Sequence, residues 1–557
     1  NFLKWQVHRR VLDFVRLHSI LTFRHLNGKL SVKIPSFPNQ LSYIVDMSSL
    51  FRSLSKDQRH EVRSRMSLER RKALEKYLNE LLFIINMESN VTEVFEFLEL
   101  STLSISRPEA SGKLKEGYLR NRLFDARPKS CCLWFIPQRK RFMTQWFIIR
   151  SSYIVYVDRI DQSSPAEVIL CDPYFKVEFF NQDYQTLLKP FTALIKNGTK
   201  KLEVRCESNL QMQYWMKDLQ ALAKDNVWCQ IHRFNSFAPI RSGCKMDWLT
   251  DSKDYFEMVA KSISNAQHEV YIHGWWVSPE LYLKRPPSKF PELRLDKLLQ
   301  KKATEGVRIF IIIFKEVTLA LPINSYHTKV SLERLHPNIS VQRHPDHLGG
   351  ILLWAHHDKL VVVDQKIAFI GGVDLCYGRY DNCDHSLVDY NPDSEEDVIW
   401  SGLDYSNPRI KDFRNVTQYS QPLVDRRTIP RMPWHDVQAA FYGQPARDAA
   451  RHFIQRWNYI KSQKSMHREG QVPFLLPKED FTESDVKKLG YAGTSSIQLL
   501  RSSAEWSSGM LPEVSIYDAY VQAIERSEYF IYIENQFFVS KCADAQVTPV
   551  RNRIATA

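Results

Sequence analysis

The sequence lacks any apolar run long enough to span a membrane as a helix. Its longest candidate, Ile309 to Phe314, has the length of a buried strand instead. The opening segment NFLKWQVHRR has no apolar core of the kind that a signal peptide needs, and it lacks an initiator Met. We therefore expect a cytoplasmic chain that is truncated at its N-terminus and that can meet a membrane only at its surface.

Cysteine is scarce and scattered: there are nine residues, of which only Cys131 and Cys132 are neighbours, and there is no CxxC pair. This pattern argues against a disulfide framework and a cysteine zinc site, and it favours a reducing compartment. No metal site is predicted. Acidic residues are outnumbered by basic ones, so the formal charge is +13. A charge of this sign predicts an anionic partner, either nucleic acid or an anionic membrane surface, and charge alone does not distinguish the two.

The most informative motif lies in the run His356 to Asp374, HHDKLVVVDQKIAFIGGVD, which contains His357-x-Lys359. Side chains two residues apart on a strand point to the same face, so both are expected to project into one cleft at the edge of an apolar strand. A neutral imidazole can attack phosphorus, and a lysine ammonium can stabilise phosphoryl oxygens. The alternative is a core histidine beside a lysine that reaches the surface.

Further residues of the same run complete the pattern. Asp364 follows Lys359 at the end of the predicted strand, where the chain must turn. A return strand then leads to Gly371 and Gly372, which permit a ligand to approach the backbone closely. The HxKxxxxD pattern followed by a glycine pair favours a phosphate-handling site over a core histidine.

Residues 1–105 form the first of three blocks. Apolar residues from Val11 to Leu21 and from Leu74 to Leu82 recur at helical spacing. The block resembles a phox-homology domain, which has an α+β fold. This resemblance implies that Arg10 and Arg70 bind a phosphoinositide headgroup, with a solvated charged face as the alternative.

Residues 112–227 form the second block, with short alternating strands and a final helix from Leu210 to Ala223 that carries Trp215. The block resembles a pleckstrin-homology domain, a β-barrel whose last helix packs a tryptophan on the barrel. We therefore expect Trp215 to be a core residue.

Residues 231–557 form the third block. Strands from Val270 to Val277 and from Val307 to Ile313 flank a helix near Asp296 to Thr304, which predicts an α/β layer. The HxKxxxxD run, the string PRMPWHD that ends at Asp436 and the string IYIENQFF all resemble phospholipase D. Taken together, the chain resembles the multidomain eukaryotic subtype in which phox and pleckstrin modules precede the α/β catalytic domain.

This resemblance implies hydrolysis of phosphatidylcholine to phosphatidic acid and choline through a phosphohistidine intermediate. One histidine attacks phosphorus, and the histidine of a second motif protonates the leaving alcohol and then activates water. His357 is the expected nucleophile, although the assignment between the two histidines stays open. Lys359 would bind phosphate, and Asp364 would orient the motif. Phosphatidylinositol 4,5-bisphosphate is the implied activator, and calcium is not expected because no acidic calcium loop precedes the block.

The resemblance also assigns residues further along the chain. Asp436 would orient the histidine of the second motif, and capping of a following helix is an equal alternative. Arg447 and Arg451 lie four apart on one helix side. With Arg456 they would form a basic face for phosphatidylinositol 4,5-bisphosphate, and a salt-bridged surface helix is the alternative.

Glu534, Asn535 and Gln536 end a predicted strand and would line the cleft, with a structural turn as the alternative. A second HxKxxxxD is absent from the 557 residues, although the resemblance implies two copies. We expect a fragment that is inactive alone, with the second motif and the acid that orients His357 lying beyond the last residue. A non-catalytic phosphoinositide-binding scaffold and a nuclease of the same superfamily are the other interpretations. The two lipid-type modules argue against a nucleic-acid partner and for a peripheral membrane location.

Overall fold

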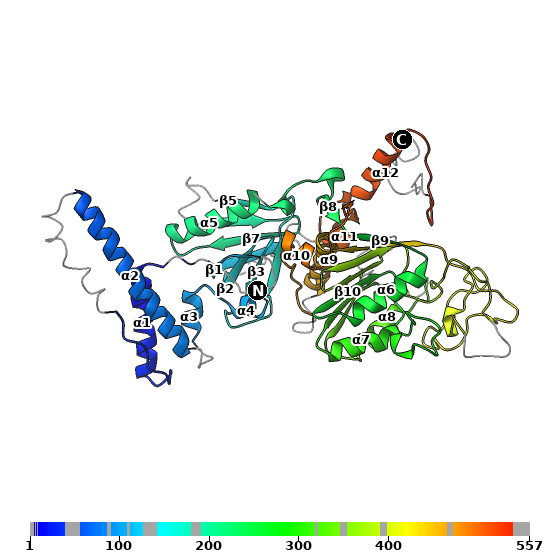
Figure 1. Ribbon diagram of the computed structural model, residues 1–557, viewed down its shortest axis with the longest axis horizontal. Helices are drawn as coiled ribbons and strands as arrows, with labels where there is room; N and C mark the ends of the chain where they lie inside the picture. The colour runs from blue at the N-terminus through cyan, green and yellow to red at the C-terminus, as the bar shows by residue number, and fades with distance from the viewer. Residues whose placement is uncertain are drawn as a thin grey trace, which may run out of the picture.

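The computed structural model places three blocks along the longest axis of the molecule (Figure 1). Helices of the first block lie at one end, an antiparallel sheet lies in the middle, and an α/β body lies at the other end. The residues described are 5, 7, 9–38, 56–85, 91–107, 112–125, 142–179, 191–224, 226–317, 321–345, 354–389, 398–464 and 472–538.

The regular elements that the structure describes in the first block are all helices. Its elements are α1 (Val11–Leu26), α2 (Lys56–Ile85), α3 (Thr92–Phe97) and α4 (Thr102–Ser106). Leu17 and Leu21 of α1 pack with Tyr77 and Leu81 of α2 in one small core. The two predicted helices are therefore confirmed, whereas the described residues of this block contain no strand of the expected α+β fold.

The middle block is one seven-stranded sheet in the order β4-β3-β2-β1-β7-β6-β5, followed by a helix. Every pairing in this sheet is antiparallel. The elements are β1 (Lys113–Asp125), β2 (Met143–Arg150), β3 (Tyr153–Val157), β4 (Glu167–Leu170), β5 (Lys176–Phe179), β6 (Thr192–Lys196), β7 (Lys200–Arg205) and α5 (Asn209–Lys224). Trp215 of α5 is buried against this sheet, as the sequence predicts.

The third block is built on a mixed sheet in the order β12-β11-β10-β13-β14-β15-β9. Only the β10–β11 and β11–β12 pairs are parallel. The strands are β9 (Met246–Thr250), β10 (Glu269–Gly274), β11 (Arg308–Phe314), β12 (Ile339–His344), β13 (Leu360–Val363), β14 (Ile367–Gly371) and β15 (Val437–Tyr442). The helices packed with them are α6 (Ser252–Ser264), α7 (Leu295–Thr304), α8 (Ser325–Glu333) and α9 (Gln444–Lys464).

Both faces of the mixed sheet are covered. Val361 and Val363 of β13 belong to the core shared with α6 and α7, whereas Leu360 and Val362 belong to the core shared with α9. Phe453 of α9 stacks on a tyrosine of β10 with ring centroids 4.7 Å apart. The second core continues into the middle block, so α9 lies between the two sheets. This double coverage explains why the strand sequences are apolar at successive positions.

Smaller elements complete the third block. These are β8 (Arg241–Cys244), α10 (Glu483–Lys488), β16 (Ser495–Ile497), β17 (Ser502–Ser503), α11 (Glu505–Ser508), β18 (Glu513–Val514), α12 (Ser515–Glu525) and four short 3-10 turns at 227–229, 233–235, 291–293 and 402–404. Among the described helices, none has the length and apolar character needed to cross a membrane.

Candidate active site

The HxK pair lies just before β13 rather than on it, since the strand begins at Leu360. The His357 side chain is exposed, and its ring centroid lies 6.1 Å from that of Trp275. No hydrogen bond to its imidazole exists within the described residues. Lys359, in contrast, is buried. The two side chains therefore differ in exposure, and their projection into one cleft stays a prediction.

The Lys359 ammonium is held in place by two acceptors. Its Nζ lies 2.8 Å from Oδ2 of Asp374 and donates to the carbonyl oxygen of His357 at 3.0 Å. Asp374 also accepts the backbone N–H of Trp275 at 2.9 Å. An ammonium group has three N–H donors, so one remains for a phosphoryl oxygen. Sequence reasoning gave Asp374 no role, although it ends the same run that contains the HxK pair.

The surroundings of His357 favour its neutral form. Desolvation by neighbouring groups and the nearby Lys359 ammonium both lower the pKa of His357, while Asp374 and Asp358 oppose the shift. The net effect is an imidazole that is unprotonated at neutral pH. An exposed neutral imidazole without a hydrogen-bond partner is available as a nucleophile.

Asp364 has a structural role at the far end of β13. Its carboxylate accepts the backbone N–H groups of Gln267, His268 and Glu269 at 2.9, 2.7 and 2.9 Å. Asp364 and the residue after it have positive φ angles of 54° and 53°, as in a two-residue hairpin turn. The residue therefore fixes the β13–β14 hairpin to the start of β10 and makes no contact with a reacting group.

Protein atoms fill the space beside Gly371 and Gly372, so this space is not open to a ligand. A Cβ atom at Gly371 would lie 2.0 Å from Gln438 Oε1, and one at Gly372 would lie 2.1 Å from Asp436 Oδ1. Any side chain at either position would therefore collide with β15 or with the residue before it. This corrects the expectation that the glycines leave the backbone open to a ligand.

Asp436 comes directly before strand β15, so it cannot cap a helix there. Its Oδ1 accepts the backbone N–H of Val437 at 2.8 Å. Its carboxylate packs on Gly372, which places an acid beside the run that carries the HxK pair. The helix-capping alternative is wrong, and orientation of a histidine remains the functional interpretation.

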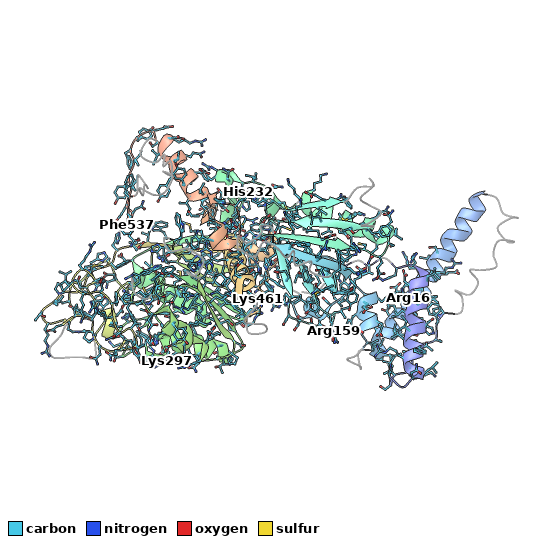
Figure 2. The ribbon with its side chains drawn as sticks, turned by 180° about the vertical axis from the view of Figure 1, so that it is seen from behind. Arg16, Arg159, His232, Lys297, Lys461 and Phe537 are labelled. Carbon is cyan, nitrogen blue, oxygen red and sulfur yellow. The ribbon has the colours of Figure 1, made fainter. Side chains whose placement is uncertain are left out.

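The segment around Glu534 does not form the expected strand. Residues 527–538 have no regular structure and are exposed, and Figure 2 shows Phe537 on a segment that extends away from the body of the molecule. The Glu534 carboxylate lies 3.8 Å from His435 Nε2, and Asn535 accepts a weak hydrogen bond from Tyr520 at 3.5 Å. Gln536 makes no hydrogen bond or ion pair with any residue that the structure describes. A strand needs a partner, and none of the described residues pairs with this segment.

The three arginines of α9 do not form a membrane-facing surface. Arg451 is 5% exposed and donates to the carbonyl oxygens of Ser152 and Cys171 in the middle block at 3.0 and 2.7 Å. Burial lowers the pKa of Arg451 to about 10. Arg447 is half-buried over the ring of Phe481. Both the lipid-binding and the surface-helix interpretations of Arg451 are therefore wrong, because α9 lies between two sheets.

Arg456 belongs to a charged network that sequence reasoning missed. Its NH1 donates to Oδ2 of Asp358 at 2.8 Å. The same oxygen lies 2.9 Å from His452 Nε2 and 3.3 Å from His273 Nδ1. Burial alone would raise the pKa of Asp358, but Arg456 and His273 hold it well below its ordinary value. The signal for this network was the acid between the motif histidine and lysine, which the motif pattern leaves unspecified.

The two arginines of the first block that are predicted to bind a headgroup have different surroundings. Arg10 precedes α1, is highly exposed and pairs with Asp13 at 3.6 Å. Arg70 lies half-buried on α2. Within the described residues, no hydrogen bond or ion pair joins the two side chains. Their assignment as lipid ligands stays a prediction.

Comparison with known proteins places these features in context. Residues 262–548 match the family model described as Phospholipase D, and residues 1–101 match the model described as PX domain. Phospholipase D1 of Schizosaccharomyces pombe is 36% identical over 613 residues, covering 100% of this chain and 44% of the relative. Phospholipase D2 of Bos taurus is 39% identical over 508 residues, covering 87% of this chain and 53% of the relative.

Phospholipase D1 of Homo sapiens is 32% identical over 701 residues, covering 100% of this chain and 64% of the relative. The chain thus spans about half the length of the curated relatives it matches.

Proposed function

Because the chain belongs to the phospholipase D family, we propose that it provides the nucleophilic half of an enzyme that hydrolyses phosphatidylcholine to phosphatidic acid and choline. The observation that carries this proposal is the His357 imidazole. It is exposed, its pKa is lowered, and it lies next to the lysine whose ammonium keeps one donor available. These are the properties that a nucleophile for a phosphodiester requires.

In the proposed first step, a neutral imidazole nitrogen of His357 attacks phosphorus, and the bond between phosphorus and the choline oxygen breaks. Lys359 stabilises the charge on the phosphoryl oxygens through its remaining N–H. The choline alkoxide takes a proton from the acid of a second histidine–lysine unit, which is supplied from outside these 557 residues. Water, deprotonated by that same histidine, then attacks the phosphohistidine. The nitrogen–phosphorus bond breaks, and phosphatidic acid leaves.

Asp436 is proposed to orient the second histidine. Its carboxylate lies against Gly372 of the run that carries the HxK pair, and its Oδ2 accepts no hydrogen bond from a described residue. An acid that accepts one imidazole N–H fixes the tautomer that presents the other nitrogen to the substrate.

Membrane recruitment is proposed to come from the first block. The match to the PX domain model and the basic stretch from Lys56 to Lys76 support binding to an anionic phosphoinositide surface, with Arg70 as a contact. We propose peripheral attachment to a cytoplasmic leaflet and activation by phosphatidylinositol 4,5-bisphosphate without calcium. The middle block is proposed to be a pleckstrin-homology barrel that assists this attachment.

The test is choline release from phosphatidylcholine vesicles by the product of the complete transcript. Choline and phosphatidic acid in equal amounts, lost in His357→Gln, support the proposal. Release that His357→Gln leaves unchanged contradicts it.

A second candidate is a phosphoinositide-binding scaffold without catalytic activity, which the single HxKxxxxD copy favours. Reading the transcript downstream of Ala557 separates the two. A second HxKxxxxD there supports the enzyme, and a stop codon supports the scaffold.

A further inference from the structure

Close to Asp436, three side chains from distant parts of the chain meet. Asp251 precedes α6, His385 lies in the irregular region after β14, and His435 precedes β15. One ligand atom from each lies within 4.8 Å of the other two. His435 Nδ1 is 2.7 Å from Asp251 Oδ1, and His385 Nε2 is 3.6 Å from Asp251 Oδ2. Two imidazole nitrogens therefore converge on one carboxylate.

The outer nitrogen of each histidine also faces a carboxylate. His385 Nδ1 lies 3.4 Å from Asp381 Oδ2, and His435 Nε2 lies 3.8 Å from Glu534 Oε1. Metal-bound histidines commonly donate their other N–H to a carboxylate, which fixes the ring and makes the inner nitrogen a better ligand. In this group the outer nitrogen of each histidine lies at ion-pair distance from such a carboxylate, and neither makes a hydrogen bond to it.

The outer carboxylate of His385 is itself fixed. Asp381 is fully buried, and its Oδ2 accepts from Arg431 at 2.6 Å and from the backbone N–H of Trp434 at 2.7 Å. The support for the His385 ring is therefore rigid, as a preorganised ligand needs.

The charged network around Arg456 of α9 (the α9 network) differs from the group of Asp251, His385 and His435. His273, Asp358 and His452 also bring two imidazoles and one carboxylate together. There the Arg456 guanidinium already lies 2.8 Å from the shared oxygen, so a second cation would be repelled. No lysine or arginine among the described residues pairs with Asp251, which is 4% exposed. Its charge is balanced only by the two imidazoles.

From this geometry we propose that Asp251, His385 and His435 bind one divalent cation of the zinc class. Two imidazole nitrogens with one carboxylate suit Zn²⁺ or Co²⁺ better than Mg²⁺ or Ca²⁺, which prefer oxygen ligands. The 47% exposure of the His435 side chain provides a route of entry and leaves a fourth position for water. The cation would tie the region between β14 and β15 to the start of α6. The sequence predicts no metal because the three ligands are far apart along the chain.

The test is a Co²⁺ titration of the chelator-treated chain, followed by visible absorption and by competition with Zn²⁺. We expect one equivalent of Co²⁺ with the intense bands of a tetrahedral site, displaced by Zn²⁺, and a Zn²⁺-dependent rise in melting temperature. His435→Gln, at a half-exposed position, should lower the affinity at least about 10-fold while the circular dichroism spectrum is unchanged. His385→Gln should also lower the affinity for Co²⁺, which tests a second ligand independently.

The matched control is His327→Gln. His327 also faces a carboxylate, with its Nε2 3.2 Å from Glu280, but no second histidine joins that pair. Its substitution should leave Co²⁺ affinity unchanged. Absence of Co²⁺ absorption in the unaltered chain, or equal affinity in His435→Gln, His385→Gln and His327→Gln, overturns the proposal.

Discussion

The charged network around Asp358 and the Lys359–Asp374 pair beside His357 differ in how their members are partnered. In the α9 network, the Asp358 carboxylate is hydrogen-bonded to Arg456 and His452 and lies 3.3 Å from His273 Nδ1. At the HxK pair itself, Lys359 is held by Asp374, but His357 has no partner among the described residues. Buried charges that are paired in this way hold the fold together, whereas the exposed His357 imidazole beside the held lysine is the group available for chemistry.

The largest difference between the two groups should appear in the rate of phosphoryl transfer. We use phosphatidyl-p-nitrophenol, whose nitrophenolate leaves without needing a proton, so the 557-residue chain can be assayed alone. His357→Gln should lower the burst of nitrophenol at least about 1,000-fold, because the nucleophile is lost. The exposed control His268→Gln should keep the burst. A full burst in His357→Gln would show that another group attacks phosphorus.

Asp358→Asn should act on stability instead. The substitution leaves the Arg456 guanidinium without its charged partner at a buried position, so the free energy of unfolding should fall by about 3 kcal/mol. Urea denaturation followed by circular dichroism measures this change, with His357→Gln as the variant that should not shift the midpoint. An unchanged midpoint for Asp358→Asn would remove the structural role assigned to the network.

The pH dependence of the burst sharpens the comparison. Only neutral imidazole attacks, so the rate should rise with pH as His357 loses its proton and then level off. Desolvation and Lys359 lower the pKa of His357 from its ordinary 6.5, so the half-maximal rate should fall below pH 6.5. Stopped-flow measurements between pH 4.5 and about 8 test this. A midpoint at or above 6.5 would contradict the described surroundings of His357.

The smallest expected effect concerns lipid binding. Arg451→Met should change affinity for phosphoinositide vesicles less than about 2-fold, because the side chain lies between two sheets. Arg70→Ala should lower the affinity about 5-fold, since each basic residue near an anionic leaflet contributes about 1 kcal/mol. Vesicle co-sedimentation compares the two. If Arg451→Met loses more vesicle affinity than Arg70→Ala while its melting temperature is unchanged, Arg451 and not Arg70 contacts the lipid.

Local periodicity predicted much of the fold. The helix carrying Trp215, the helix around Tyr77 and the strands flanking α7 were read from apolar spacing, which burial against one neighbour imposes directly. The HxKxxxxD pattern likewise located His357, Lys359 and the hairpin that follows them.

Contacts between distant segments could not be predicted in this way. Helical spacing places Arg447 and Arg451 on one side of α9. It cannot show that the middle block covers that side. The string IYIENQFF was expected to form a strand that ends at Glu534 to Gln536, but a strand forms only with a partner, and the described residues offer none. The meeting of Asp251, His385 and His435 depends on the sheet order, which single-sequence patterns do not contain.

The most direct test of the central claim is the location of the covalent intermediate. The chain is mixed with phosphatidyl-p-nitrophenol and quenched, and the tryptic peptide that ends at Lys359 is fragmented in a mass spectrometer. The account predicts a phosphatidyl group on His357 and none on its buried neighbour His356. An adduct on any other residue, or a nitrophenol burst without an adduct on this peptide, would contradict it.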